Sequence, residues 1–408
     1  MDKSLLHTPE GVRDIYGTEY ARRLLVEKKL RDTIRLYGYQ DIQTPAFEFF
    51  DVFSRQVGTT PSNQLYKFFD KEGNTLSLRP DFTPSCARCI AKYFMEEERP
   101  LRFTYSGSTF TNTSNLQGKL KEVTQMGAEL MLDGSVQADA EMIGMVIEAL
   151  KSCGLQDFQI TIGQVEYFKG ICAQAGIDGE VALSLRDFIS AKNYFGAQEL
   201  LERHRVRRDY AQVLLRLSDT VLGPSDLCEA KRTVDNERSL SAIERLEQLF
   251  EVLRQYGVEK YVSFDLGLLS KLNYYTGVIF KGYTYGVGDA IVTGGRYDTL
   301  LSHFGKHSPA IGFTILVDDL MEALARQGLE PEVAPCGVLI AYEKELFADA
   351  LQRAQTLRRE GIPVTLLADV PDYAALKAFS ADRMIGRAIV MKKEGNEELT
   401  FVWEKTDI

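Results

Sequence analysis

Apolar residues near the N-terminus recur at the spacing of an amphipathic helix. Val26, Leu30, Ile34 and Tyr37 follow one another at intervals of four, four and three residues, which places them on one helical face. Gly38 follows directly, in the position where helices commonly end. This pattern predicts a helix that starts near Thr18 and turns one face toward a core.

Short apolar and alternating runs then predict a region rich in strands. Residues 65–70 and 75–78 flank a Lys-Glu-Gly-Asn turn, which is typical of a hairpin. Residues 102–110 and 123–132 predict a second pair of strands, separated by a polar loop. Further elements are expected as strands at 39–43 and 158–162 and as helices at 85–94 and 138–151.

The pattern changes between residues 166 and 256, where long charged amphipathic stretches with little strand signal predict a helical module. Strand-like runs return at 261–265, 274–280 and 290–293, and a helix is expected at 316–327. Pro331 and Pro335 indicate a linker. The tail then predicts a βαβ unit, with strands at 338–342 and 364–367 around a helix at 345–360.

These segments divide the chain into three predicted parts. Residues 1–165 and 257–330 form a discontinuous core, residues 166–256 form a helical insertion, and residues 337–408 form a small C-terminal α/β domain. A length of 408 residues fits two or three domains.

Charge and composition narrow the class of protein. The formal net charge is -10, and an acidic chain is a poor match to the basic surface with which proteins grip nucleic-acid phosphates. No apolar run approaches the roughly 18 residues needed to span a bilayer, and the N-terminus lacks the apolar core of a signal peptide. We therefore expect a cytoplasmic protein that binds no membrane.

The sequence offers no metal site and no cofactor motif. Cys86 and Cys89 lie close together, but zinc would need two further ligands at matched spacing, so small buried thiols on a helix are expected. His303 and His307 are four residues apart, yet Gly305 and Pro309 place them in a loop. A Walker-type phosphate loop and a nucleophile elbow are also missing from the sequence.

One pair of polar residues stands out in an otherwise apolar strand. Gln125 and Glu129 are four residues apart, so their side chains share a face. A buried carboxyl is costly unless it meets a cation or hydrogen-bond donors. The ammonium group of an amino acid would satisfy Glu129, and so would a structural arginine. Tyr274 and Tyr275 are expected at the start of a strand, either as core residues or as ligand contacts.

Several motifs in one order resemble the catalytic domain of histidyl-tRNA synthetase. The resemblance implies an α+β fold with the antiparallel sheet of class II aminoacyl-tRNA synthetases, a helical insertion, and a tail similar to a truncated anticodon-binding domain. The motifs lie at residues 8–14, 38–45, 65–70 with 78–84, 272–277, and 293–298. The resemblance also implies that the second motif, residues 38–45, forms a dimer interface.

The departures from that family concern its arginines. At three positions where the synthetase uses arginine to hold ATP phosphates or the substrate carboxylate, this chain has Thr111, Ser270 and Asp319. Lys271 lies beside Ser270, but lysine lacks the planar fork with which arginine grips carboxylate and phosphate at two points. The resemblance therefore implies that no catalytic residues remain for adenylation.

The amino-acid side of the family's pocket is kept. Asp81 stands where synthetases usually have glutamate, a feature that resembles their regulatory relatives. By resemblance, four residues match the positions that bind the ammonium group of histidine and two tyrosines match those around its imidazole, namely Asp81, Thr83, Gln125 and Glu129, with Tyr274 and Tyr275.

This profile is similar to the regulatory subunits of ATP phosphoribosyltransferase, which are catalytically inactive relatives of the synthetase. The resemblance implies a regulatory protein of the first step of histidine biosynthesis. Such a protein binds free histidine, activates a short catalytic subunit and mediates its feedback inhibition. A homodimer within a hetero-octamer, no cofactor and no tRNA partner are implied. Two alternatives stay open: a divergent histidyl-tRNA synthetase, or a synthetase-like histidine-binding module of another system.

Overall fold

The computed structural model describes residues 6–54, 60–113, 119–217, 223, 226–270, 274–381 and 383–401. The chain divides into two compact units. One consists of residues 1–13 and 26–330, and the other of residues 14–25 and 331–408. Each unit is built around β-sheet of its own. No helix in the described ranges is long and apolar enough to cross a membrane.

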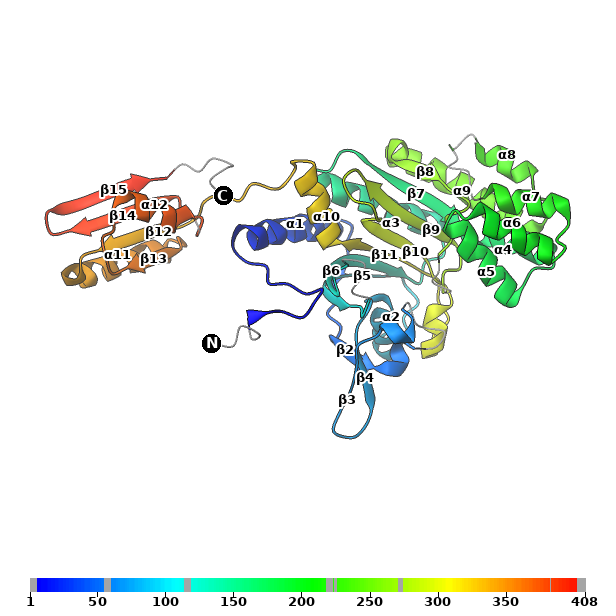
Figure 1. Ribbon diagram of the computed structural model, residues 1–408, viewed down its shortest axis with the longest axis horizontal. Coiled ribbons are helices and arrows are strands. Elements are labelled where there is room, and N and C mark those ends of the chain that lie inside the picture. The colour runs from blue at the N-terminus through cyan, green and yellow to red at the C-terminus, as the bar shows by residue number, and fades with distance from the viewer. Residues whose placement is uncertain are drawn as a thin grey trace. The chain divides into compact units, whose positions relative to one another are not determined.

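An eight-stranded sheet forms the centre of the first unit (Figure 1). Its inner strands pair antiparallel, as the class II resemblance implied, whereas the edge pairs β1–β5 and β7–β8 are parallel. In spatial order the strands are β1 (Gln40–Asp41), β5 (Leu101–Phe110), β6 (Glu122–Met131), β11 (Ala310–Leu316), β10 (Val292–Arg296), β9 (Val278–Thr284), β7 (Phe158–Gln164) and β8 (Val262–Phe264).

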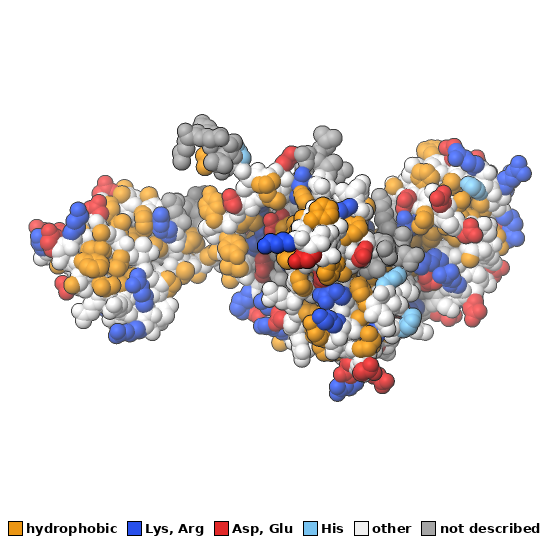
Figure 2. Space-filling model, turned by 90° about the horizontal axis from the view of Figure 1, so that it is seen from below, with side chains coloured by type: hydrophobic (Ala, Val, Ile, Leu, Met, Phe, Trp, Pro, Cys, Tyr) orange, Lys and Arg blue, Asp and Glu red, His pale blue; other side chains and the backbone are white. Residues whose placement is uncertain are grey.

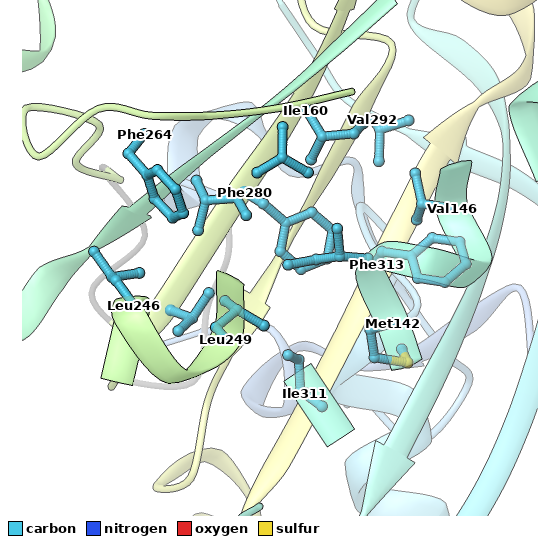
Figure 3. Packing of buried hydrophobic residues seen from close by; sticks show 14 of the residues in the cluster. Met142, Val146, Ile160, Leu246, Leu249, Phe264, Phe280, Val292, Ile311 and Phe313 are labelled. Atoms are coloured by element: carbon cyan, nitrogen blue, oxygen red, sulfur yellow. The ribbon is translucent and has the colours of Figure 1, made fainter. Parts of the chain in front are cut away.

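One face of this sheet carries the main hydrophobic core. Helices α3 (Val136–Ser152) and α9 (Glu237–Gln255) contribute to it, and α1 (Gly17–Leu36) adds Val26, Leu30 and Ile34, as predicted. Figure 3 shows Met142 of α3 and Leu249 of α9 among the apolar side chains of the strands. Because side chains alternate along a strand, the opposite face of the same strands is left for other residues.

The described residues between 165 and 255 form a series of helices, as expected. Their apolar side chains join the same hydrophobic cluster as the sheet, and Figure 1 shows these helices beside the sheet. That this stretch is an inserted domain stays a prediction. The helices are α4 (Val165–Gln174), α5 (Gly179–Ser190), α6 (Tyr194–Arg203), α7 (Arg208–Arg216), α8 (Leu227–Arg232) and α9.

A buried ionic cluster connects the helical stretch to the sheet. Asp139 of α3 is fully buried and accepts hydrogen bonds from Arg296 of β10, at 2.6 and 2.9 Å. The other carboxylate oxygen of Asp139 accepts from Arg245 of α9, at 2.8 Å. Both guanidiniums also donate to main-chain carbonyls next to α3. Desolvation of Asp139 is thereby compensated by two cations.

A small three-stranded sheet packs beside helix α2 (Thr83–Tyr93), and consists of β2 (Phe47–Phe49), β4 (Thr75–Leu78) and β3 (Lys67–Phe69). Glu48 faces α2 and accepts from Arg88 at 2.8 Å. Phe47 and Phe49, which alternate with Glu48, are 52% and 59% exposed. Figure 2 views the molecule from the side on which this sheet lies in Figure 1, and shows hydrophobic side chains at the surface there.

The structure corrects three expectations about local structure. The strand expected at 274–280 begins only at Val278, and the amide of Thr276 donates to the carbonyl of Arg296 outside the strand. Strand β11 was not predicted, because its apolar run is interrupted by Gly312 and leads straight into helix α10 (Val317–Arg326). The expected strand at 290–293 instead runs from Val292 to Arg296.

The second unit contains a four-stranded sheet in the order β13 (Val364–Leu367), β12 (Val338–Tyr342), β14 (Arg387–Lys392) and β15 (Gly395–Thr400). Strands β13, β12 and β14 are parallel to one another, as the predicted βαβ pattern requires, and β15 is antiparallel. Separate apolar clusters involve α11 (Phe347–Arg359) and α12 (Tyr373–Ala381).

Candidate functional site

A cavity of about 160 Å³ opens on the face of the large sheet opposite the main core. It brings together five of the six residues that were predicted as a ligand site: Asp81, Thr83, Gln125, Tyr274 and Tyr275. The sixth, Glu129, is fully buried and adjoins the cavity through Thr83. The sequence therefore predicted a set of residues that the fold places together.

Glycines make the floor of the cavity. Gly312 of β11 lies opposite Glu129 in the strand register and opposite Gly295 of β10 on its other side. A β-carbon on Gly312 would lie 1.8 Å from Oε2 of Glu129, and one on Gly295 would lie 2.7 Å from Cε1 of Tyr275. Both contacts are too short for real atoms, so the site depends on the missing side chains.

Glu129 is held by two hydroxyl groups. Thr83 Oγ1 donates to its Oε1 at 2.8 Å, and the hydroxyl of Tyr297 donates to its Oε2. Among the described residues, no lysine or arginine pairs with this carboxyl. Burial raises the pKa of Glu129 to about 8, although the hydrogen bonds from Tyr297 and Thr83 lower it, and the nearby Asp81 carboxylate raises it further.

The two predicted tyrosines lie in the segment before β9. The ring of Tyr274 is tilted against Tyr275, with centroids 4.6 Å apart, and meets Tyr297 edge-on at 5.9 Å. All three tyrosines are buried, and all three line the cavity. Burial raises the pKa of Tyr274 and of Tyr275, so both remain neutral phenols that offer aromatic surface and a hydroxyl.

The polar wall is formed by Asp81 and Gln125. Asp81 precedes α2, and its Oδ1 accepts the amide of Thr83 at 3.2 Å. Gln125 projects from β6, on the same face as Glu129. Its Oε1 is buried and accepts no hydrogen bond in the described part of the protein. A ligand with N–H donors would satisfy this atom, because a buried acceptor without a partner is unfavourable.

Sequence reasoning missed Tyr297 and the glycine floor. Tyr297 was part of a recognised motif, but nothing in its spacing indicated that it would reach Glu129, which lies 168 positions away along the chain. The contact arises because β11 lies between β6 and β10, which brings these two strands close together in the sheet. The neighbouring Arg296 points to the opposite face, where it binds Asp139.

The three former arginine positions lie outside the cavity lining. Thr111 follows β5, and its amide donates to the carbonyl of Lys121 at 2.8 Å. Asp319 is in α10, where burial, followed by repulsion from Asp318, raises its pKa to about 6. Ser270 is described, but its neighbour Lys271 lies outside the described residues.

Cations are missing from the cavity lining, which among the described residues contains no lysine or arginine. The described lining therefore offers a phosphate chain no guanidinium or ammonium partner. No group of three potential metal ligands occurs in the described ranges either. His303 lies in the short 3-10 helix η8 (Leu300–Phe304), and His307 follows it in a loop.

The sequence of the chain is similar to those of known proteins. Residues 11–320 match the family model for histidyl-tRNA synthetase. An ATP phosphoribosyltransferase regulatory subunit from Acetivibrio thermocellus is 39% identical, over 97% of this chain and 94% of the relative. One from Ruminiclostridium cellulolyticum is 37% identical, over 100% of this chain and 97% of the relative.

Solved structures show the same likeness. A protein from Bacillus halodurans, described as an ATP phosphoribosyltransferase regulatory subunit/histidyl-tRNA synthetase, superposes with a TM-score of 0.83 at 31% identity, over 95% of this chain and 97% of the other. A histidyl-tRNA synthetase from a Nostoc species has a TM-score of 0.80 at 20% identity, covering 97% of this chain and 96% of that one. The latter supports the fold alone.

Proposed function

The chain belongs to the family of ATP phosphoribosyltransferase regulatory subunits, which has the histidyl-tRNA synthetase fold, and from this premise we propose that it senses free histidine in the cavity beneath α2. Its role in the complex is regulatory and not catalytic. Histidine bound there would lower the activity of a separate catalytic subunit.

The observation that carries the proposal is the chemistry of the cavity. It combines the carboxyls of Asp81 and Glu129 with the unpartnered oxygen of Gln125. An ammonium group would add an N–H donor for Oε1 of Gln125 and would bring a positive charge beside the two carboxyls. Tyr274 and Tyr275 offer an aromatic wall with hydroxyls for the imidazole.

The same cavity disfavours a working synthetase. Adenylation develops negative charge on phosphate, and removing one donor at such a site costs about 10²–10³ in rate. The described lining supplies no cation for that charge, and Asp319 replaces one of the expected arginines by a carboxyl. The divergent-synthetase alternative is therefore the weaker reading.

The proposed partners are a short catalytic ATP phosphoribosyltransferase subunit and a second copy of this chain. The exposed aromatic face of the small sheet, where Phe47 and Phe68 pack edge-on at 5.8 Å, supports the homodimer. The hetero-octamer is proposed from the family resemblance. We propose no tRNA partner, because the second unit exposes several carboxylates that would repel phosphate, namely Asp369, Asp372, Glu394, Glu397 and Glu398. A cytoplasmic location fits a role in biosynthesis.

Calorimetric titration with histidine tests the ligand. Changing Glu129→Ala or Asp81→Ala removes a charged hydrogen-bond partner, which contributes about 1.5–3 kcal/mol. The dissociation constant should rise roughly ten- to a hundred-fold. Glu397→Ala, an exposed carboxylate of β15, serves as the control and should bind as the parent does. Unchanged affinity in both cavity variants, with folding intact, would place the ligand elsewhere.

A further inference from the structure

Glu129 is a buried carboxyl that has no counter-ion among the residues that the structure describes. In the described part of the chain, the titratable groups that interact with it are five phenols, one thiol and one other carboxyl: Tyr39, Tyr105, Tyr274, Tyr275, Tyr297, Cys86 and Asp81. Burial raises the pKa of each phenol and of the thiol, so these groups are neutral at pH 7. Among the described residues, the charged group that acts on Glu129 is therefore Asp81, and its charge has the same sign.

The opposite strand brings no cation either. Gly312 faces Glu129 across the β6–β11 register and has no side chain. Within the described ranges, an ionised Glu129 would thus be stabilised only by the hydroxyls of Thr83 and Tyr297, against a desolvation penalty of several kcal/mol. A protonated carboxyl keeps both contacts, since it can itself donate to the oxygen of Tyr297.

We propose that Glu129 holds a proton while the cavity is empty and releases it to the solvent when a cationic group of the ligand docks beside it. The inference rests on the proposed function only in taking the ligand to carry an ammonium group. The positive charge of the ligand then replaces the positive charge of the proton at a buried site.

The coupling has a calculable size. With the pKa of Glu129 raised to about 8 by burial, about nine-tenths of the empty sites are protonated at pH 7. Each binding event at pH 7 should therefore release about nine-tenths of a proton. By linkage, affinity should rise about fivefold between pH 7 and pH 8, since the protonated fraction falls from about nine-tenths to about one-half. Histidine would be sensed more weakly in an acidified cell.

The experiment is calorimetric titration of the full-length protein with histidine at pH 7, in phosphate and in Tris, whose heats of ionisation differ. The parent protein should release about nine-tenths of a proton more than Glu129→Gln, whose binding we expect to be roughly ten- to a hundred-fold weaker. Asp81→Asn is the matched control, because it also removes a cavity carboxylate but should keep most of the proton release, since burial raises the pKa of Glu129 more than Asp81 does.

Infrared difference spectra provide a second readout. Addition of histidine to the parent should remove a protonated-carboxyl band, and the band should be missing from Glu129→Gln before and after addition. Equal proton release in parent and Glu129→Gln, or an unchanged carboxyl band in a parent that binds histidine, would overturn the inference and leave the proposed function standing. A folded parent protein that binds no histidine would overturn the proposed function itself.

Discussion

The substitution Gly312→Ala probes the site without replacing any side chain that is proposed to bind the ligand. Gly312 has no positive backbone φ that would itself exclude alanine. The added β-carbon would lie 1.8 Å from Oε2 of Glu129 and 3.0 Å from the carbonyl oxygen of Ala128. The carboxyl of Glu129 must therefore move away, because it is the flexible partner in this contact.

The magnitude follows from what that movement breaks. Glu129 would lose its contact with Tyr297, and the buried phenol hydroxyl would be left without its partner, which costs about 1–3 kcal/mol. Overpacking in a close-packed core costs a similar 1–3 kcal/mol. We expect the free energy of unfolding to fall by about 2–6 kcal/mol, the sum of these two costs, and the affinity for histidine to fall roughly tenfold or more.

Urea unfolding and histidine titration measure the two effects. Gly288→Ala is the matched control, because a β-carbon there meets nothing within 4 Å. The double variant Gly312→Ala, Glu129→Ala isolates the clash, since the alanine at 312 should be nearly harmless once the carboxyl is gone. A Gly312→Ala protein that binds histidine like the parent, or an equal loss of stability in both backgrounds, would refute the reasoning.

Three further predictions follow from the same structure. In a histidine-dependent ATP–pyrophosphate exchange assay, the protein should show background activity only, and exchange clearly above a synthetase-free control would contradict the regulatory assignment. Arg296→Met leaves buried Asp139 with one cation and should lower the free energy of unfolding in urea by about 3–5 kcal/mol. Arg245 has a side chain that is 27% exposed, so Arg245→Met should cost clearly less. The reverse order would contradict the account of the buried pair. Because the folded state raises the pKa of Glu129 from 4.5 to about 8, its contribution to stability is full below pH 4.5 and is lost as the pH rises through 8, by at most about 1.4 kcal/mol per pH unit. The stability of the parent relative to Glu129→Gln should therefore fall over that range, and a flat difference would show that Glu129 does not titrate there.

Local periodicity predicted the elements whose signal is local. The four-residue spacing in α1 and the alternation in β5 and β6 depend on neighbouring residues, and each was confirmed within two residues at its ends. The four-residue spacing of Gln125 and Glu129 placed both on one face of β6 for the same reason.

The pairing of strands that are far apart in the chain could not be predicted from the sequence. The register that sets Gly312 against Glu129 depends on β11, which reads as an apolar run broken by glycine and was not recognised. The role of Tyr297 could not be predicted without that register, and neither could the choice of hydroxyls over an arginine as partners of Glu129. Family resemblance predicted that the other cavity residues form one site. Periodicity alone had left open whether they are core residues or ligand contacts.

The most direct test of the account is an assay of a short catalytic ATP phosphoribosyltransferase subunit with and without this chain. Alone, the chain should show no transferase activity. Mixed with the catalytic subunit it should raise activity, and histidine should then lower it. The Glu129→Ala protein should still assemble and activate, but inhibition should require roughly ten- to a hundred-fold more histidine. Inhibition of parent and variant at the same histidine concentration would contradict the assignment of this cavity as the sensor.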